Sequence, residues 1–252
     1  MAIIKSFISA VSLYSKIPMP NLDYKEGEDR FSICFFPVIG LIILGLMELV
    51  AYLNTYFSLG SVSMAIIIAL IPVIITGGIH LDGFMDVMDG VHSYAGREKR
   101  LEILEDPHIG AFCVIKLLEV AGLWMLFIIE TKSRFYLLAG CGFVISRALS
   151  GIALVTFKPA KEGGMLYFTR SHSSSSCKIV LVMWAAVVYV ICLCLYKIAA
   201  ILPVVLSVAS FFYYRYRSEK DFGGITGDIA GCFLVMTETA WLFGIFIMGL
   251  FI

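Results

Sequence analysis

Charge is scarce in this 252-residue sequence, and neither sign is in excess. Only 15% of the residues are charged and the formal net charge at pH 7 is +0, whereas a soluble domain carries about a quarter charged residues. So few charges could not cover a soluble protein of this size, and their balance excludes the basic surface of a nucleic-acid-binding protein. Polar stretches longer than about thirty residues are also missing. We therefore interpret residues 1–252 as one integral membrane domain.

Paired cysteine motifs are missing too. The seven cysteines lie mostly within apolar segments, and no two of them form a Cys-x-x-Cys pair. This spacing argues against a zinc site and against a disulfide framework. We expect the cysteines to be small buried apolar residues of a protein in a reducing compartment.

Apolar residues, in contrast, are abundant: they make up 60% of the chain, at a mean hydropathy of +0.93. They gather in seven long runs, each close to the ~20 residues that a helix needs to cross ~30 Å of hydrocarbon. The sequence predicts an all-α polytopic membrane protein of about seven spans, with six as the alternative because the sixth run is short. The runs are residues 33–53, 61–79, 111–129, 135–157, 178–196, 198–214 and 232–252.

Residues 1–20 precede the first run and have an amphipathic pattern. Four polar residues recur at spacings of 4, 3 and 4 opposite an apolar face, and Pro18 ends the pattern. Such a helix lies in the membrane interface or packs against the helix bundle, and the sequence leaves both open. The polar face is Lys5, Ser9, Ser12 and Lys16, and the apolar face is Ile4, Phe7, Ile8, Val11 and Tyr14.

Basic residues indicate the orientation of the predicted spans. Of the 19, 14 lie in the N-terminal stretch and in segments 80–110, 158–178 and 215–231, three lie on the opposite side, and two lie inside spans. Because cytoplasmic loops carry such an excess, we expect the N-terminus and these segments in a prokaryotic cytoplasm and the C-terminus outside the inner membrane. Fifteen of the 19 carboxylates and all four histidines share these segments. Chemistry is therefore expected at the cytoplasmic face.

Three aspartates in the second of these segments have helical spacing. Asp82, Asp86 and Asp89 stand at i, i+4 and i+7, which places them on one face of a helix. No lysine or arginine lies between them to offset their mutual repulsion. Hard oxygen ligands suit Mg²⁺, which prefers one or two carboxylates together with substrate phosphates. We therefore predict a Mg²⁺ site here, with a solvated acidic helix end as the alternative.

Two further segments supply candidate contacts for a phosphate-bearing substrate. Arg97 and Arg100 lie on a short charged helix that ends at Pro107, and guanidinium groups suit phosphate oxygens, although such mixed charge also fits an ordinary surface helix. Before the last span, glycines permit close approach of the backbone to a phosphate at a helix N-terminus. The candidates there are Gly223, Gly224, Thr226, Gly227 and Asp228, the last as a metal ligand or a plain N-cap.

Charged residues inside the predicted spans have functional or packing roles by default, because they are costly in hydrocarbon. Lys116 and Glu119 are spaced to pair with each other. Arg147 and Glu238 have no local partner, so both are candidate substrate contacts, with a contact between them inside the bundle as the alternative. His80 flanks the aspartates and is a candidate ligand or base.

Several of these residues stand in longer motifs. The first is Gly77-Gly-Ile-His-Leu-Asp-Gly-x-x-Asp-x-x-Asp-Gly90, followed by Arg100-Leu-Glu-Ile-x-x-Asp106 and Ile109-Gly-Ala-Phe112. Others are Arg30 with Phe36-Pro-x-x-Gly40, Ser146-Arg147, Lys161-Glu-Gly163 and Gly223-Gly-x-Thr-Gly-Asp228-x-x-Gly231. Together they resemble the cobalamin synthase family, also called adenosylcobinamide-GDP ribazoletransferases, along the whole chain.

This resemblance implies a Mg²⁺-dependent membrane enzyme for the last joining step of cobalamin assembly. Such an enzyme joins adenosylcobinamide-GDP to α-ribazole or its 5′-phosphate and releases GMP. Asp82, Asp86 and Asp89 would hold the metal, with Asp228 as a further ligand. One carboxylate or His80 would take the proton of the attacking hydroxyl, and the sequence does not choose among them. It also leaves open homo-oligomerisation and association with other cobalamin-assembly enzymes.

The sequence departs from the family pattern in two places. Members usually carry two glutamates after the last loop, whereas Val235 occupies the first of these positions and only Glu238 remains. Pro107-His108 replaces a more usual Ser-Arg pair, which removes a cation from a candidate phosphate contact.

Two other functions are weighed against this one. A CDP-alcohol phosphotransferase also uses clustered aspartates at the membrane face, but its Asp-Gly-x-x-Ala-Arg element is missing because Phe84-Met-Asp-Val follows Asp82-Gly83. A membrane transporter should place polar groups near mid-bilayer in broken spans, whereas the charges here gather at one face. The pattern therefore favours an enzyme.

Overall fold

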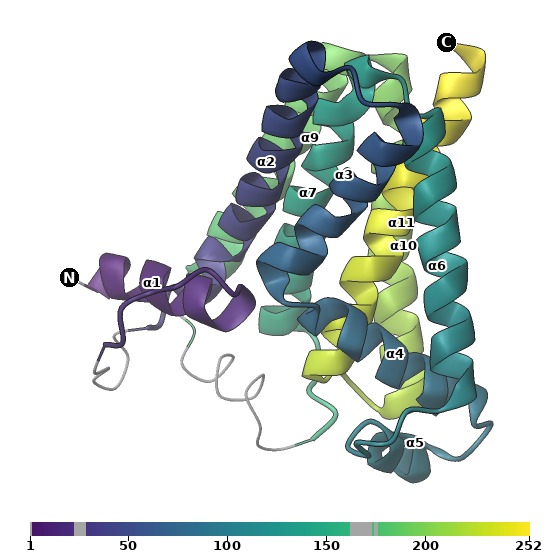
Figure 1. The fold of residues 1–252 in the computed structure, drawn as a ribbon. Coiled ribbons are helices and arrows are strands. Elements are labelled where there is room, and N and C mark those ends of the chain that lie inside the picture. The colour runs from purple at the N-terminus through teal and green to yellow at the C-terminus, as the bar shows by residue number, and fades with distance from the viewer. Residues whose placement is uncertain (1, 23–28, 162–172, 174–175) are drawn as a thin grey trace.

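The computed structural model describes residues 2–22, 29–161, 173 and 176–252, and these form a bundle of long helices with short helices at one end (Figure 1). Among the described residues there is no β-strand, only an isolated bridge between Pro159 and Ile225. The all-α prediction is confirmed. The long helices are α2 (Phe36–Phe57), α3 (Ser61–Thr76), α6 (Ala111–Glu130), α7 (Tyr136–Thr156), α9 (Cys177–Tyr196), α10 (Ile198–Phe222) and α11 (Gly227–Phe251). The short ones are α1 (Ala2–Tyr14), α4 (Ile79–His92) and α5 (Arg97–Ile103), with 3₁₀ turns at Ser32–Phe35 and Ser133–Phe135.

The number of spans agrees with the sequence, although one of them is short. Within the described part of the chain, six helices are long and apolar enough to cross a membrane, and a seventh is counted if α3 and α4 form one broken span. With 16 residues, α3 is about 24 Å long. The chain then turns by 92° at Gly77 and Gly78, whose φ angles of 66° and 80° are open to glycine at little cost. The predicted run 61–79 therefore ends as a helix at Thr76, and α4 crosses the end of the bundle.

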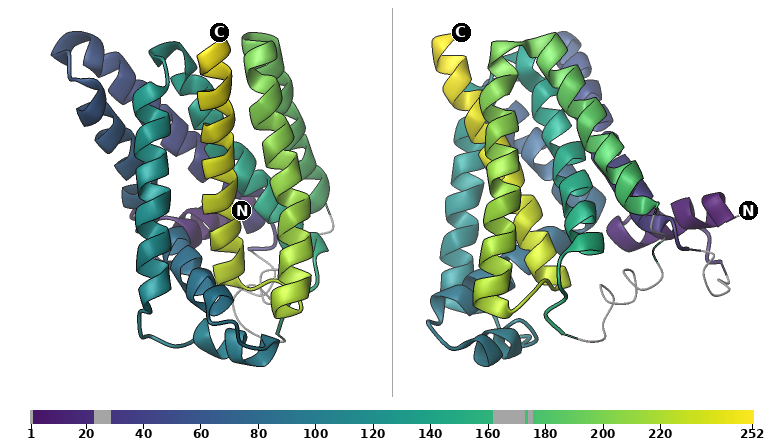
Figure 2. Two further views of the ribbon diagram at one scale, coloured as in Figure 1. Left: turned by 90° about the vertical axis from the view of Figure 1, so that its right-hand side faces the viewer. Right: turned by 180° about the vertical axis from the view of Figure 1, so that it is seen from behind.

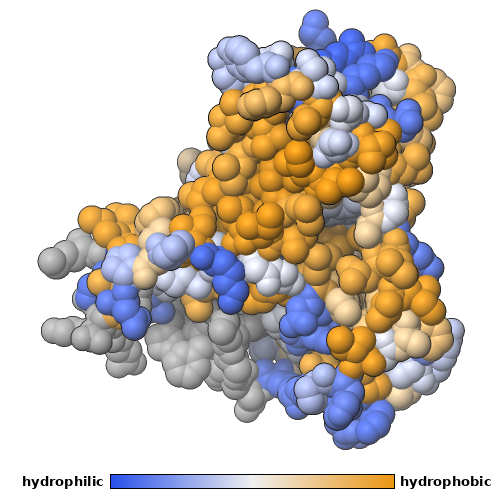
Figure 3. All heavy atoms as spheres, in the orientation of Figure 1, coloured by the Kyte–Doolittle hydropathy of each residue, from blue (hydrophilic) through white to orange (hydrophobic). Residues whose placement is uncertain are grey.

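Helix α7 forms the centre of the bundle and is buried along nearly its whole length. It packs against α2, α9 and α11, while Figure 2 shows α3 with α6 on one side of the molecule and α9 with α10 on the other. Apolar side chains cover the middle of the face seen in Figure 3, and hydrophilic side chains lie toward its two ends. This is the distribution that a lipid-exposed bundle requires.

The described parts of the segments that the charge count places together do lie together. The short helices α1, α4 and α5 and the end of α10 lie toward one end of the bundle, and the C-terminus lies at the other (Figure 1). The predicted loop 215–231 is wrong in extent, because α10 continues to Phe222 and α11 begins at Gly227. A helix can continue beyond the membrane where charged neighbours pair, as Arg215 Nε and Glu219 Oε1 do at 3.2 Å. Lys25, Glu162, Gly163, Arg170 and His172 fall outside the described residues.

The N-terminal helix α1 combines the two arrangements that the sequence left open. Ile3 and Ile4 are 65% and 66% exposed, whereas the middle of the helix packs against α2 and the turn before it. Ser9 is only 7% exposed, so its predicted place on an outward polar face is wrong. The neighbouring Ser6 Oγ accepts a hydrogen bond of 3.3 Å from Phe31 N, which explains why small polar side chains face inward here.

Candidate active site

The site is built where α4 crosses the first turns of α11. A Cβ added at Gly83 would lie 2.7 Å from Asp228 Cα, and one added at Gly231 would lie 3.2 Å from His80 Cα. The two backbones therefore approach more closely than larger residues would allow. This crossing brings Asp228 beside an aspartate-bearing helix that lies about 140 residues earlier in the chain.

Three carboxylates share this crossing, and we name Asp82, Asp86 and Asp228 the carboxylate cluster. Burial, and then the negative charges of Asp82, Asp228 and Asp89, raise the pKa of Asp86 to about 6. Asp82 is exposed and Asp86 is half-buried. The prediction that Asp82 and Asp86 share a helical face is confirmed by α4, and their electrostatic influence on each other is the repulsion that the spacing indicated.

Asp89 lies on the same helix but has different partners. Its two carboxylate oxygens accept hydrogen bonds from Gly110 N at 2.7 Å and from Cys113 N at 2.9 Å. These are unpaired donors at the start of α6, where a negative charge is favoured. The sequence predicts Asp89 as a metal ligand, and in this structure the side chain caps α6.

The donor set of the carboxylate cluster fits Mg²⁺, but it does not form a complete cage. Within the described part of the chain, no group of three or more His, Cys, Asp or Glu side chains is placed to hold a metal ion. Mg²⁺ commonly binds through one or two carboxylates and takes its other ligands from water and substrate phosphates. A cation at the cluster would therefore depend on a phosphate-bearing substrate for part of its coordination.

The glycine-rich loop begins α11 in a way that the sequence only partly predicts. Thr226 is the N-cap residue, because its Oγ1 accepts a hydrogen bond of 3.2 Å from Ile229 N. The alternative that Asp228 is the N-cap is therefore wrong, and Asp228 lies in the first turn. Gly227, the first residue of α11, would meet nothing within 4 Å if it carried a Cβ. The space where a side chain would stand at Gly227 is therefore open.

The two preceding glycines have structural reasons of their own. Gly223 ends α10 with a left-handed φ of 80°. A Cβ at Gly224 would lie 2.5 Å from Lys158 O. The backbones are this close because two hydrogen bonds join them: Ile225 N donates to Lys158 O at 2.9 Å, and Ala160 N donates to Ile225 O at 3.0 Å. Close backbone approach is therefore real at Gly224, but its partner in this structure is segment 158–160.

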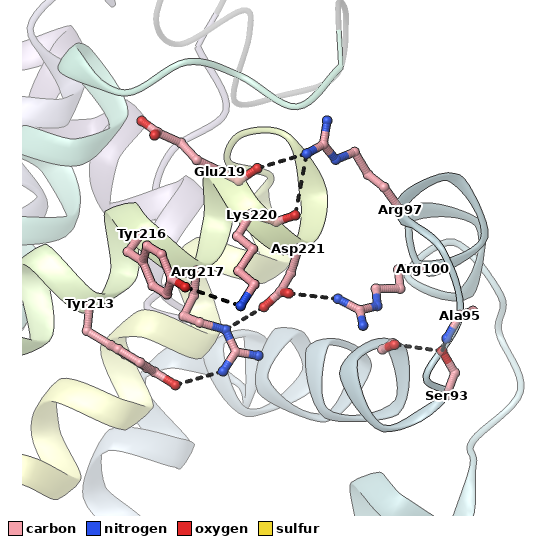
Figure 4. Close-up of polar contacts among 11 residues, drawn as sticks. Ser93, Ala95, Arg97, Arg100, Tyr213, Tyr216, Arg217, Glu219, Lys220 and Asp221 are labelled. Carbon is pink, nitrogen blue, oxygen red and sulfur yellow. Dashed lines mark hydrogen bonds and ion pairs between the residues drawn. The ribbon is translucent and has the colours of Figure 1, made fainter.

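The two arginines of α5 bind the end of α10 (Figure 4). Arg97 Nη2 donates to the carbonyl oxygens of Glu219 and Lys220 at 3.2 and 3.4 Å. Arg100 Nη1 contacts Asp221 Oδ1 at 2.8 Å, and Asp221 Oδ2 is taken by Arg217 Nε. The sequence predicts both α5 arginines as substrate contacts, and in this structure both have protein partners.

A buried ion pair joins the spans α7 and α11. Arg147 Nη1 lies 2.8 Å from Glu238 Oε1, with the two side chains 1% and 6% exposed. Ser146 Oγ donates to the same Glu238 oxygen at 2.7 Å, and Arg147 Nη1 also donates to Phe143 O at 2.9 Å. The contact inside the bundle, which the sequence left as an alternative, is confirmed.

His80 and this ion pair line a cavity that the sequence analysis does not predict. The cavity measures about 250 Å³ and is otherwise bounded by side chains of α3, α4, α6 and α11. Burial, and then the Arg147 guanidinium, lower the pKa of His80 to about 3, so its ring is neutral at pH 7. No sequence signal could have revealed the cavity, because most of its wall residues are apolar and have the pattern of ordinary spans.

Comparison with known proteins covers nearly the whole chain. The family model described as cobalamin-5-phosphate synthase matches residues 6–246. The adenosylcobinamide-GDP ribazoletransferase of Lachnoclostridium phytofermentans is 37% identical over 91% of this chain and 88% of its own length. Proteins of the same name from Treponema denticola and a Geobacillus species are 34% and 30% identical, over 94% of this chain in each case and 96% and 92% of their own. No solved structure gives a significant match. From the extent of these matches, the chain belongs to the cobalamin-5-phosphate synthase family.

Proposed function

We propose that this protein joins adenosylcobinamide-GDP to α-ribazole, or to its 5′-phosphate, and releases GMP. The relatives that match over most of their length carry the name of this activity. The observation on which the proposal depends is the carboxylate cluster of Asp82, Asp86 and Asp228 at one end of the bundle. Three carboxylates repel a diphosphate, and a bound Mg²⁺ would remove this repulsion because it takes ligands from both carboxylates and substrate phosphates. The cluster therefore supports a cation-dependent reaction of a diphosphate.

The proposed transfer of a phosphoryl group uses a cation and a proton acceptor. The acceptor hydroxyl attacks the phosphorus on the cobinamide side of the diphosphate, and the bond from that phosphorus to the bridging oxygen breaks, so that GMP leaves with that oxygen. Mg²⁺, when bound, would neutralise the charge that develops on the phosphate oxygens. Asp82 and Asp228 would hold it. Asp86, whose pKa is raised to about 6 by burial and by its acidic neighbours, suits the acceptance of the hydroxyl proton.

The location of the reaction follows from the charge distribution. The excess of basic residues in the N-terminal stretch and in the segments around α4, α5 and the end of α10 supports a cytoplasmic location for that end of the bundle. We therefore place the reaction at the cytoplasmic face of the bacterial inner membrane. Both proposed substrates would then reach the carboxylate cluster from the cytoplasm.

The decisive assay measures GMP release by the purified protein in detergent. We expect GMP from adenosylcobinamide-GDP only when both α-ribazole and Mg²⁺ are present. Release of GMP without α-ribazole would indicate a hydrolase and contradict the proposal. CMP release from a CDP-alcohol would instead support the phosphotransferase alternative, and activity that requires sealed vesicles would support a transporter.

A further inference from the structure

The cavity of about 250 Å³ lies between α3, α6 and the first turn of α4. Its walls are almost wholly apolar, and Trp124 is fixed in one of them because its Nε1 donates to Thr239 Oγ1 at 2.7 Å. The volume is below the 300–1,000 Å³ that is typical of drug-sized ligands. Its size therefore suits a small ring system and is far too small for a corrinoid.

Two buried nitrogen atoms belong to the polar side chains that line this cavity. Neither His80 Nε2 nor Arg147 Nε has a hydrogen-bond partner within the described part of the chain. A buried polar atom without a partner is unfavourable, and a ligand that brings an acceptor would satisfy one of them once the side chains that cover it shift aside. A lipid acyl chain has no acceptor, whereas a heteroaromatic ring has one in its plane. The polar atoms therefore favour an aromatic heterocycle over a lipid.

We propose that this cavity binds the flat aromatic base of the acceptor nucleoside. The inference rests on the proposed function, in which the acceptor is α-ribazole and its base is a dimethylbenzimidazole. This base is bicyclic and apolar except for one ring nitrogen that is not bonded to the sugar. The apolar walls and the indole of Trp124 suit its faces, and the unpartnered nitrogen of Arg147 or His80 suits its acceptor.

The position of the cavity also suits the reaction. Leu81 lines the cavity, and Asp82 of the carboxylate cluster follows it directly on α4. Successive side chains of a helix are about 100° apart. The cavity and Asp82 therefore lie on neighbouring faces of the first turn of α4, so the ribose of a nucleoside whose base fills the cavity would extend toward the carboxylate cluster.

Filling the cavity tests the proposal. Ala121 lies in the wall formed by α6, and Ala121→Phe should raise the KM for α-ribazole about tenfold or more, while the KM for adenosylcobinamide-GDP changes less than about twofold. Ala69→Met fills the cavity from α3 and should act in the same direction if Ala121→Phe does not fold. The matched control is Ala186→Phe, since Ala186 is exposed on α9 and lies outside the cavity wall.

A direct binding measurement separates this inference from the proposed function. Free 5,6-dimethylbenzimidazole should change the tryptophan fluorescence of the unmodified protein and of Ala186→Phe, but not that of Ala121→Phe. An unchanged KM for α-ribazole in both cavity-filling variants, with GMP release intact, would overturn the inference and leave the function standing. Saturable binding of the base without any α-ribazole-dependent GMP release would show that the cavity binds the ring but that the proposed function is wrong.

Discussion

At the scale of single residues, the acidic side chains of α4 and α11 differ in their partners, and amide substitutions separate their roles. Asp82→Asn, Asp86→Asn and Asp228→Asn each remove a charge and keep the shape of the side chain. We expect each to lower kcat on the order of a hundredfold and to raise the Mg²⁺ concentration that is needed, because the cation loses a ligand or the hydroxyl loses its base. The measurement is GMP release against Mg²⁺ concentration.

The control for these variants is Glu98→Gln on α5, where the side chain is exposed and should tolerate the change. Near-native activity of all three cluster variants at low Mg²⁺ would mean that the aspartates form a solvated helix end and that the mechanism proposed here is wrong.

Asp89 belongs to a different prediction because it caps α6. Asp89→Ala leaves Gly110 N and Cys113 N without an acceptor and should cost about 0.5–2 kcal/mol of stability. The expected result is a lower thermal midpoint in detergent, whereas Asp86→Asn should leave the midpoint close to that of the unmodified protein. An Asp89→Ala protein that keeps its midpoint but needs a higher Mg²⁺ concentration would instead restore Asp89 to the metal site.

The bundle should be more stable when both charges of the buried Arg147–Glu238 pair are present, or when both are removed, than when only one remains. Arg147→Met leaves an unpaired carboxylate inside the bundle, and removal of one partner of a buried pair typically costs about 3–5 kcal/mol. Adding Glu238→Leu should recover most of that loss. Thermal unfolding followed by tryptophan fluorescence checks this. Equal losses in the single and double variants would show that packing, and not charge pairing, is decisive.

Local spacing predicts some of these residue roles and necessarily misses others. The i, i+4 spacing of Asp82 and Asp86 is enough to put them on one face of α4. The partners of Asp89 lie 21 and 24 residues further along the chain, and no periodicity indicates which helix end will pack there. The same holds for Arg147 and Glu238, which are 91 residues apart.

At the scale of elements, the close contact of α4 with α11 depends on Gly83. Gly83→Ala would put a Cβ 2.7 Å from Asp228 Cα, so the two helices would have to move apart. We expect a large loss of activity with little loss of helix, because the carboxylate cluster would be separated while each helix remains formed. GMP release and circular dichroism together measure this.

Gly122 offers a matched control on α6, since a Cβ there would meet nothing within 4 Å. Gly122→Ala should keep full activity, because alanine is the better helix former by roughly 1 kcal/mol. An active Gly83→Ala protein would show that the α4–α11 distance is not critical for the reaction.

The arginines of α5 should act first as a clamp on the end of α10. Replacing Arg97 and Arg100 together by alanine removes the contacts to the Glu219 and Lys220 carbonyls and to Asp221. Hydrogen exchange in residues 93–106 should become faster, since α5 has no buried residue of its own. Lys99→Ala is the control, because Lys99 is exposed and forms its ion pair within α5, with Glu102. Unchanged exchange with a higher KM for adenosylcobinamide-GDP would favour the phosphate contact that the sequence predicts.

The apolar runs predict that the helices exist, but ion pairs and packing determine where the helices end. The run 198–214 predicts a short span, yet α10 continues to Phe222 because paired charges let the helix extend beyond hydrocarbon. The bend after Thr76 is indicated by Gly77 and Gly78 in the sequence, but its angle of 92° depends on where α4 finds its packing partner, α11.

At the scale of the whole molecule, the charge count and the fold give the same grouping by independent routes. The count uses only the sequence and groups the N-terminal stretch with the segments around α4, α5 and the end of α10. The fold brings the same elements together through packing (Figure 1). The count alone also predicts the direction of the bundle in the membrane, because cytoplasmic loops carry the excess of basic residues.

Cysteine labelling in intact cells tests that direction. Cys194 is exposed and the other six cysteines are buried, so Cys194→Ser provides a background with little reactivity. In that background we expect Ser133→Cys, in the turn between α6 and α7, to react with a membrane-impermeant maleimide from outside. Lys99→Cys on α5 should react only after the cells are permeabilised, because the excess of basic residues predicts a cytoplasmic location for its end of the bundle. Labelling of Lys99→Cys in intact cells, with Ser133→Cys protected, would invert the bundle and place the carboxylate cluster outside the cytoplasm, away from the proposed nucleotide substrate.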